Sequence, residues 1–211
     1  MNFLIEGREY DKLMQSLNYD FKDYLNFLNN DSYNKDWKGI SIQQKEIKNY
    51  NINLRIPLDK AFSFEKKPPN LEILLNNYVK LLENIFQNYG KGNWIIKHDI
   101  QDYEWILSHW KKDKRNIGLY SLFDEMNIDY SEKGALYLPY KLFKPILHEL
   151  IGYPYLLNYR DLNFLNKAED FVIRITHHFT VDIISKNKDI ILEISNLIID
   201  EDYFDIIHYR N

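Results

Sequence analysis

The chain has 211 residues and a formal net charge of −4 at pH 7, so it has no general electrostatic attraction for nucleic acid. Apolar residues make up 45% and charged residues 27%, an ordinary composition for a globular domain with a large core. Cysteine is absent, which excludes disulfides and cysteine-ligated metals. The first residues include acidic side chains but no apolar stretch, and no apolar run is long enough to span a bilayer. We therefore expect a cytoplasmic protein with no signal peptide and no membrane contact.

Two amphipathic helices separated by a polar segment are predicted in the first part of the chain. Residues 8–29 carry apolar side chains every three or four positions, which predicts a helix. Residues 30–69 are polar and irregular, with a strand candidate at Ile52–Ile56, and are the best candidate for an extended arm or a mobile loop. A second helix is expected between Asn70, a suitable N-cap, and Gly90, which would end it.

Short elements of both kinds follow in the middle of the chain. The spacing of apolar residues predicts strands at Trp94–Lys97 and Ala135–Leu138. It predicts helices at Asp99–Lys112, Ile117–Met126 and Tyr140–Ile151.

The C-terminal stretch, residues 169–211, is the most regular part of the sequence. It reads EDFVIRITHHFTVDIISKNKDIILEISNLIIDEDYFDIIHYRN and predicts a β-hairpin, an amphipathic helix capped by Asn187 or Asp189, and an edge strand. A two-residue turn would mix the two faces of the hairpin, whereas a three-residue loop at residues 177–179 places all the buried-type side chains on one face. The favoured register therefore pairs Ile173 with Ile183, Ile175 with Val181, and Arg174 with Asp182.

These elements predict an α+β fold in a single domain, residues 1–211. It should be helix-rich, with a small, mainly antiparallel sheet. That sheet should include the C-terminal hairpin, residues 170–185, and the last strand, residues 203–209.

No sequence motif marks a catalytic or metal site. His148-Glu149 begins like the zinc-protease pattern HExxH, but Gly152 stands where the second histidine belongs. His177 and His178 lie side by side at the hairpin tip, yet a metal needs at least three convergent ligands, which favours a surface loop. Serine-nucleophile, phosphate-loop and dinucleotide patterns are absent, so we expect a protein without catalytic residues, metal or cofactor.

Two charged clusters are candidate binding sites. The basic, aromatic cluster either contacts phosphates and stacks bases, or is a helix end whose cations complement the macrodipole and whose tryptophans lie in the core. It comprises Trp105, Trp110, Lys111, Lys112, Lys114 and Arg115, and nearby acidic residues favour the second interpretation. The acidic cluster is either a surface for a basic protein partner or a solvated loop. It comprises Asp200, Glu201, Asp202 and Asp205.

The C-terminal pattern DFVIRITHHFTVDIIS, followed by a short helix and an aromatic-rich strand, resembles the ending of many immunity proteins encoded beside bacterial polymorphic toxins. It is also similar to an uncharacterised Bacillus-type family of unknown function. The resemblance covers about a fifth of the chain and implies an α+β, intracellular, often acidic protein that binds a cognate toxin. These families share no functional residues, so no residue role is carried over.

Two hypotheses follow. The first is a non-enzymatic protein that neutralises a cognate toxin by covering its active site or a functional surface. The alternative is a nucleic-acid- or nucleotide-handling protein, such as a phage or defence component, that uses the Trp105–Arg115 helix.

Overall fold

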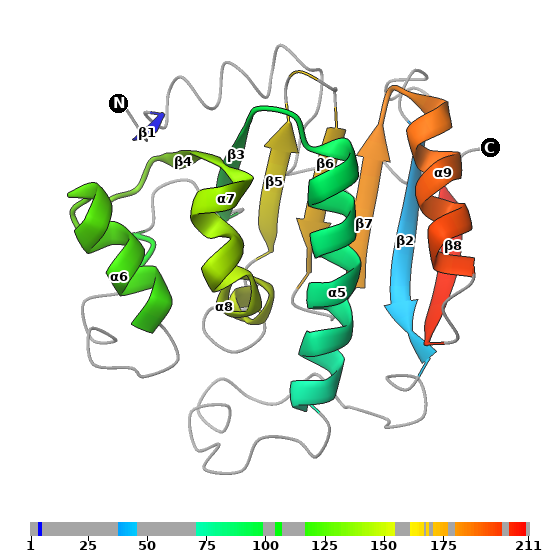
Figure 1. Cartoon of the computed structure of the whole chain (residues 1–211), viewed down its shortest axis with the longest axis horizontal. Helices are drawn as coiled ribbons and strands as arrows, with labels where there is room; N and C mark the ends of the chain where they lie inside the picture. Colours follow the sequence, from blue (N-terminus) through cyan, green and yellow to red (C-terminus); the bar gives the residue numbers. More distant parts are fainter. Residues whose placement is uncertain are drawn as a thin grey trace.

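An eight-stranded antiparallel sheet is the centre of the fold, which we describe from a computed structural model (Figure 1). The structure describes residues 4–5, 38–45, 71–98, 104–106, 117–154, 161–166, 168, 171–176, 180–199 and 203–209. The strands are β1 (Leu4–Ile5), β2 (Lys38–Gln44), β3 (Asn93–His98), β4 (Ala135–Pro139), β5 (Leu162–Asn166), β6 (Phe171–Ile175), β7 (Thr180–Ser185) and β8 (Phe204–Tyr209). Their order across the sheet is β1-β4-β3-β5-β6-β7-β2-β8.

Helices cover one face of this sheet. They are α5 (Leu71–Tyr89), α6 (Ile117–Met126), α7 (Tyr140–Phe143), α8 (Leu147–Tyr153) and α9 (Lys188–Ile199), with a 3-10 turn at Lys144–Ile146. Figure 1 shows α5, α7, α8 and α9 on the same side of the strands. The predicted α+β class is confirmed, but the sheet is larger than the small sheet that we expected.

The hydrophobic core lies between the helices and the sheet, because alternate strand residues point toward the helices. Phe86 of α5 is at its centre, with ring centroids 4.8 Å from Trp94 on β3 and 5.3 Å from Phe164 on β5. All three side chains are buried. Burial of each large apolar side chain contributes about 2–3 kcal/mol, so these contacts hold α5 on the middle of the sheet.

Polar contacts fix α5 to β2 as well. Gln44 at the end of β2 donates from Nε2 to the Leu74 carbonyl oxygen at 2.7 Å, and Asn77 donates from Nδ2 to Gln44 Oε1 at 3.2 Å. The Tyr78 hydroxyl donates to the Ile42 carbonyl oxygen at 3.4 Å. Burial raises the pKa of Tyr78 well above its ordinary value, so this tyrosine stays neutral beside the strand.

The predicted C-terminal hairpin register is confirmed. Ile173 pairs with Ile183, Arg174 with Asp182, and Ile175 with Val181. The Thr176 N–H donates to the Thr180 carbonyl oxygen at 2.9 Å, so residues 177–179 form the connection between the strands. The helix begins as expected, because Asn187 Oδ1 accepts a hydrogen bond from the Asp189 N–H at 3.0 Å.

Several other predicted elements are confirmed with small shifts. The helix after Asn70 and the helix Ile117–Met126 are α5 and α6, and the two short strands are β3 and β4. The helix predicted at Tyr140–Ile151 is divided into α7, the 3-10 turn and α8. Pro145 lies in that turn, where its missing N–H interrupts the α-helical ladder.

Two sequence predictions need correction. Part of the segment 30–69 is β2, which lies in the sheet between β7 and β8 and therefore is neither arm nor loop. Residues 104–106, predicted to be helical, are not helical, and Trp105 and Ile106 form a bend. Strand β5 was not predicted. The helix at residues 8–29, the strand candidate Ile52–Ile56 and the remaining residues of 30–37 and 46–69 lie outside the described residues.

Candidate functional site

Exposed apolar side chains gather at the β8 end of the sheet. Among the described residues, eight large apolar side chains are exposed, and five of them belong to α9 or to β8 and the residue before it: Leu192, Leu197, Ile199, Tyr203 and Ile207. The other three, Ile73, Ile117 and Tyr137, are dispersed over α5, α6 and β4. A concentration of this kind is typical of a binding surface, whereas scattered exposed apolar residues are ordinary.

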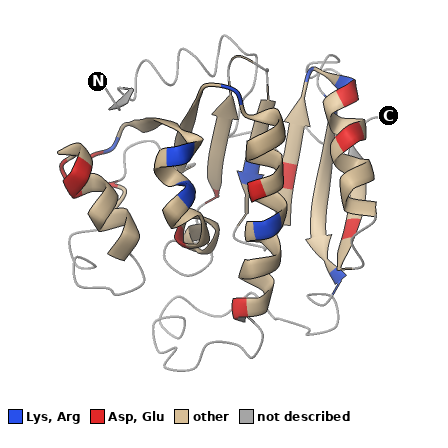
Figure 2. Cartoon of the chain, in the orientation of Figure 1, with Lys and Arg blue, Asp and Glu red and all other residues tan. Residues whose placement is uncertain are grey.

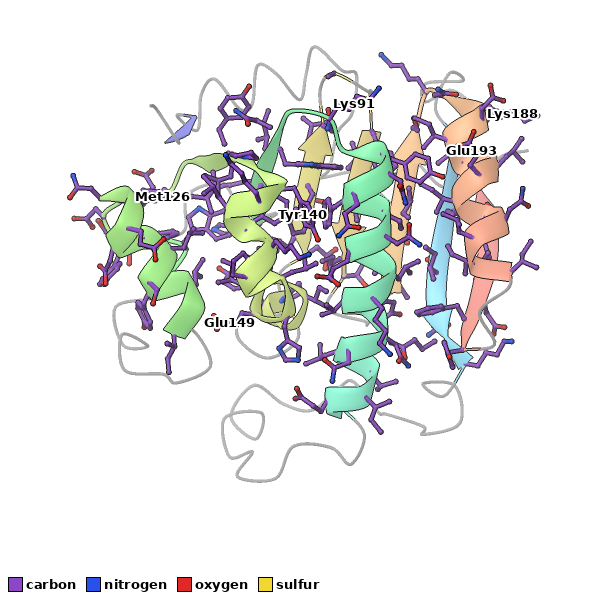
Figure 3. All side chains as sticks on the ribbon, in the orientation of Figure 1. Lys91, Met126, Tyr140, Glu149, Lys188 and Glu193 are labelled. Atoms are coloured by element: carbon purple, nitrogen blue, oxygen red, sulfur yellow. The ribbon has the colours of Figure 1, made fainter. Side chains whose placement is uncertain are left out.

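Two of the exposed residues of α9, Leu192 and Ile199, lie on the flank of the helix that faces away from α5. Glu193 faces α5: burial, followed by the charge and hydrogen bond of Glu193, raises the pKa of the Tyr89 hydroxyl at the end of α5. The buried residues Ile191, Ile194 and Ile198 form the stripe of α9 that faces the core, and at about 100° per residue Leu192 and Glu193 fall on opposite sides of this stripe. Ile199 lies about two turns beyond Leu192 on the same side. Leu192 and Ile199 therefore point away from α5, toward the outer edge beside β8. Figure 3 shows Glu193 on α9 at this end of the molecule.

We call Leu192, Ile199, Tyr203 and Ile207 the β8–α9 surface. The exposed fractions of these side chains are 46%, 68%, 50% and 52%. Ile207 lies on the sheet face opposite to α9, since its neighbour Ile206 packs against the core under the helix. The surface therefore wraps around the edge of the sheet.

Acidic residues accompany this surface. Asp205 lies on β8 opposite Gln43 of β2, and Asp189 is exposed at the start of α9, next to Lys188 (Figure 2). Glu193 is exposed as well, but on the flank of α9 that faces α5. The other members of the acidic cluster, Asp200, Glu201 and Asp202, lie outside the described residues. In the sequence they fall directly between Ile199 and Tyr203, both of which belong to the β8–α9 surface.

The basic, aromatic cluster is described only at Trp105, which is a core residue. Its side chain is 1% exposed and donates from Nε1 to the Gly134 carbonyl oxygen at 2.8 Å. The Trp105 carbonyl oxygen accepts a hydrogen bond from the Tyr153 hydroxyl at 2.8 Å. Trp105 is therefore unable to stack on a base. Trp110, Lys111, Lys112, Lys114 and Arg115 lie outside the described residues.

His148 and Glu149 have structural partners rather than a shared metal. His148 Nε2 lies 3.1 Å from Glu72 Oε1 on α5. Glu149 accepts hydrogen bonds from the Gly118 and Leu119 N–H groups at 2.9 and 3.0 Å, so its carboxylate caps the N-terminus of α6. A Cβ at Gly118 would lie 2.7 Å from Glu149 Oε1, which explains the glycine.

Other metal ligands are not brought together in the described part of the chain. No group of three or more histidine, aspartate or glutamate side chains there could hold a metal ion. His177 and His178 lie outside the described residues.

A row of polar residues crosses the sheet on the face opposite to α5 and α9. Lys97, Asn163, Arg174, Asp182 and Ser41 lie in register on five neighbouring strands and are all buried. Arg174 forms an ion pair with Asp161, which directly precedes β5. The sequence predicted the Arg174–Asp182 pairing but missed the rest of the row, because its members are adjacent only through the strand order.

Within this row, the side-chain amide of Asn163 stands out. It is 1% exposed, and neither Nδ2 nor Oδ1 has a hydrogen-bond partner among the described residues. The ionic groups beside it are buried, and Lys97 donates from Nζ to the Lys133 carbonyl oxygen. We therefore assign the row a structural role and the β8–α9 surface the role of candidate binding site.

Comparisons with protein-family models, with curated proteins and with solved structures found no match for this chain. No helix in the described ranges has the length and apolar character that crossing a membrane requires.

Proposed function

We propose that the chain is a non-enzymatic, cytoplasmic protein that binds and neutralises a cognate bacterial toxin, and that the β8–α9 surface contacts the partner. The observation that carries the proposal is the concentration of exposed apolar side chains at this end of the sheet. Removing these side chains from water on binding would supply affinity, at about 25 cal/mol for each Å² of apolar area.

The charges support a partner with a basic surface. Asp205 lies on β8 next to Ile207 in the alternation of the strand, Asp200, Glu201 and Asp202 precede Tyr203 in the sequence, and the whole chain has a net charge of −4. A rim of acidic side chains around apolar residues accelerates association with a basic protein and disfavours acidic ones.

Growth rescue tests the proposal. The product of an adjacent, toxin-like gene is expressed in bacteria with and without this chain, and complex formation is measured by co-purification and by titration of the purified proteins. The test variant is Leu192→Asp with Ile199→Asp. Its matched control is Ile73→Asp with Ile117→Asp, because those side chains have similar exposed fractions, 54% and 58%, on other elements.

The wild-type chain and the control should restore growth and bind the toxin. The Leu192→Asp, Ile199→Asp variant should bind at least about tenfold more weakly, since apolar residues at the centre of an interface dominate its affinity. Equal binding by the two double variants would show that another surface is used. Failure of the wild-type chain to bind the toxin would overturn the proposed function.

A further inference from the structure

The β8 strand offers a longer open edge than β1. Among the residues that the structure describes, it is the last strand in the sheet order and pairs with β2 along one side only. The strand at the opposite end, β1, has only two residues, whereas β8 has six. A six-residue edge whose outward backbone groups have no strand partner in the described part of the chain can accept a strand from another chain.

The pairing with β2 shows which backbone groups of β8 point outward. The Lys45 N–H donates to the Tyr203 carbonyl oxygen at 2.9 Å, so this pair is hydrogen-bonded. In an antiparallel ladder, hydrogen-bonded and non-hydrogen-bonded pairs alternate. Asp205, Ile207 and Tyr209 therefore direct their N–H and C=O groups toward β2, whereas Phe204, Ile206 and His208 direct theirs away from the sheet.

The neighbouring strands obey the same alternation. If Gln43 and Ser41 bond to β8, then Ile42 and Ile40 bond to β7. When the same alternation is continued across β7 to β6, it predicts that Thr176 and Thr180 are a hydrogen-bonded pair. The Thr176 N–H does donate to the Thr180 carbonyl oxygen, at 2.9 Å. The outward direction of the Ile206 and His208 backbone groups thus follows from two independent hydrogen bonds.

We propose that the partner binds by adding an extended, basic strand to the edge of β8. This inference rests on the proposed function, because it states how the same surface would hold the partner. The backbone of the added strand would bond to the outward groups of Phe204, Ile206 and His208.

Side chains around the edge indicate the chemistry of that strand. On the α9 side, Leu192 and Ile199 would contact apolar residues of the added strand. On the opposite face, Asp205 would lie beside a lysine or arginine, since directly opposed unlike charges favour pairing. The strand should therefore alternate between apolar and basic residues, with its apolar side chains toward α9.

A synthetic peptide provides the probe. Acetyl-KVKVKVK-amide has the required alternation, acetyl-EVEVEVE-amide reverses its charge, and acetyl-KVKPKVK-amide interrupts its backbone donors. Each is titrated into the full chain while hydrogen exchange is followed at individual amides by nuclear magnetic resonance. The basic peptide should slow exchange at Ile206 and His208, whereas the acidic and proline peptides should have no such effect.

Proline substitutions in β8 test the backbone contact. Ile206→Pro removes an outward donor and leaves the ladder to β2 intact, and Ile206→Ala shortens the side chain but keeps the donor. Ile206→Pro should bind the basic peptide about tenfold more weakly than Ile206→Ala, because an unmade hydrogen bond leaves its partner unsatisfied. Ile207→Pro, which removes an inward donor, should lower the melting temperature more than Ile206→Pro does.

The outcomes separate this inference from the proposed function. Equal peptide affinity of Ile206→Pro and Ile206→Ala, or no protection at Ile206 and His208, would overturn strand addition. If the toxin still bound to the chain, the proposed function would stand without strand addition. A dimer in the absence of peptide that Ile206→Pro abolishes would also overturn the inference, because a second copy would occupy the edge. If the peptide bound as expected but no toxin did, the toxin-neutralising function would fail and strand addition would stand.

Discussion

Arg174 and Asp161 form a buried ion pair behind the sheet. Arg174 Nε donates to Asp161 Oδ2 at 2.7 Å, and the Nη2 group of the arginine contacts the same oxygen. Both side chains are buried. The sequence placed Arg174 opposite Asp182, as the register confirms, but Asp161 comes from outside the hairpin. The ion pair thus joins β6 to the chain that enters β5, and so ties the C-terminal hairpin to the rest of the sheet.

Removing the arginine should destabilise the protein strongly. Arg174→Met leaves the Asp161 carboxylate buried without its cation, and we expect a loss of about 3–5 kcal/mol in the free energy of unfolding. Lys144→Met is the control, since Lys144 pairs with Glu83 at 3.6 Å near the surface and should contribute less than about 1 kcal/mol. Urea denaturation measures both, and similar losses would contradict the account.

Replacing Asn163 should have the opposite effect. Its buried amide has no described partner, so Asn163→Leu removes an unsatisfied polar group while keeping a similar shape. We expect the free energy of unfolding to rise by about 1 kcal/mol, within the range that an unmade buried hydrogen bond costs. A loss of stability on chemical denaturation would show that the amide is satisfied and contributes to the row.

Glu149 should stabilise α6 through its helix cap. Glu149→Ala removes the acceptor from the Gly118 and Leu119 N–H groups and should lower the free energy of unfolding by about 1–2 kcal/mol. Glu125→Ala is the control, because Glu125 is an exposed residue of α6. Thermal or urea denaturation measures the loss of stability in each of the two variants. An equal effect of both substitutions would mean that the cap contributes nothing.

Stability should fall at alkaline pH partly because of Tyr78. Burial raises the pKa of Tyr78 in the folded state, so its contribution is complete below the ordinary tyrosine pKa of 10.0 and is lost as the pH rises above it. Between about pH 10 and about pH 11 the wild-type chain should lose about 1 kcal/mol more than Tyr78→Phe. Tyr140, whose pKa burial and Glu83 raise to about 12, is present in both proteins. Parallel pH profiles would contradict this assignment.

Local patterns in the sequence predicted local structure well. The alternation in the C-terminal hairpin set its register, and the apolar spacing after Asn70 predicted α5, because both signals arise from neighbouring residues. β2 was missed although Ile40 and Ile42 alternate with Ser41 and Gln43, since so short a run lies within a polar segment. β5 was missed because both of its faces are buried and its alternation is weak.

The candidate site was only partly visible in the sequence. The acidic cluster and the edge character of the last strand were recognised, because they depend on adjacent residues. The insertion of β2 between β7 and β8 brings together residues that are far apart in the chain, and no local pattern signals it. The same is true of Leu192 and Ile199, whose outer position depends on how α9 packs beside α5.

Hydrogen exchange on the chain, alone and in the presence of the proposed toxin partner, tests the central claim most directly. The claim is that the β8–α9 surface is where the partner binds. We predict slower exchange in the complex at the outward amides of Ile206 and His208 and in α9, with little change in α6 at the other end of the sheet. Unchanged exchange in β8 and α9, together with protection elsewhere on the chain, would contradict the claim.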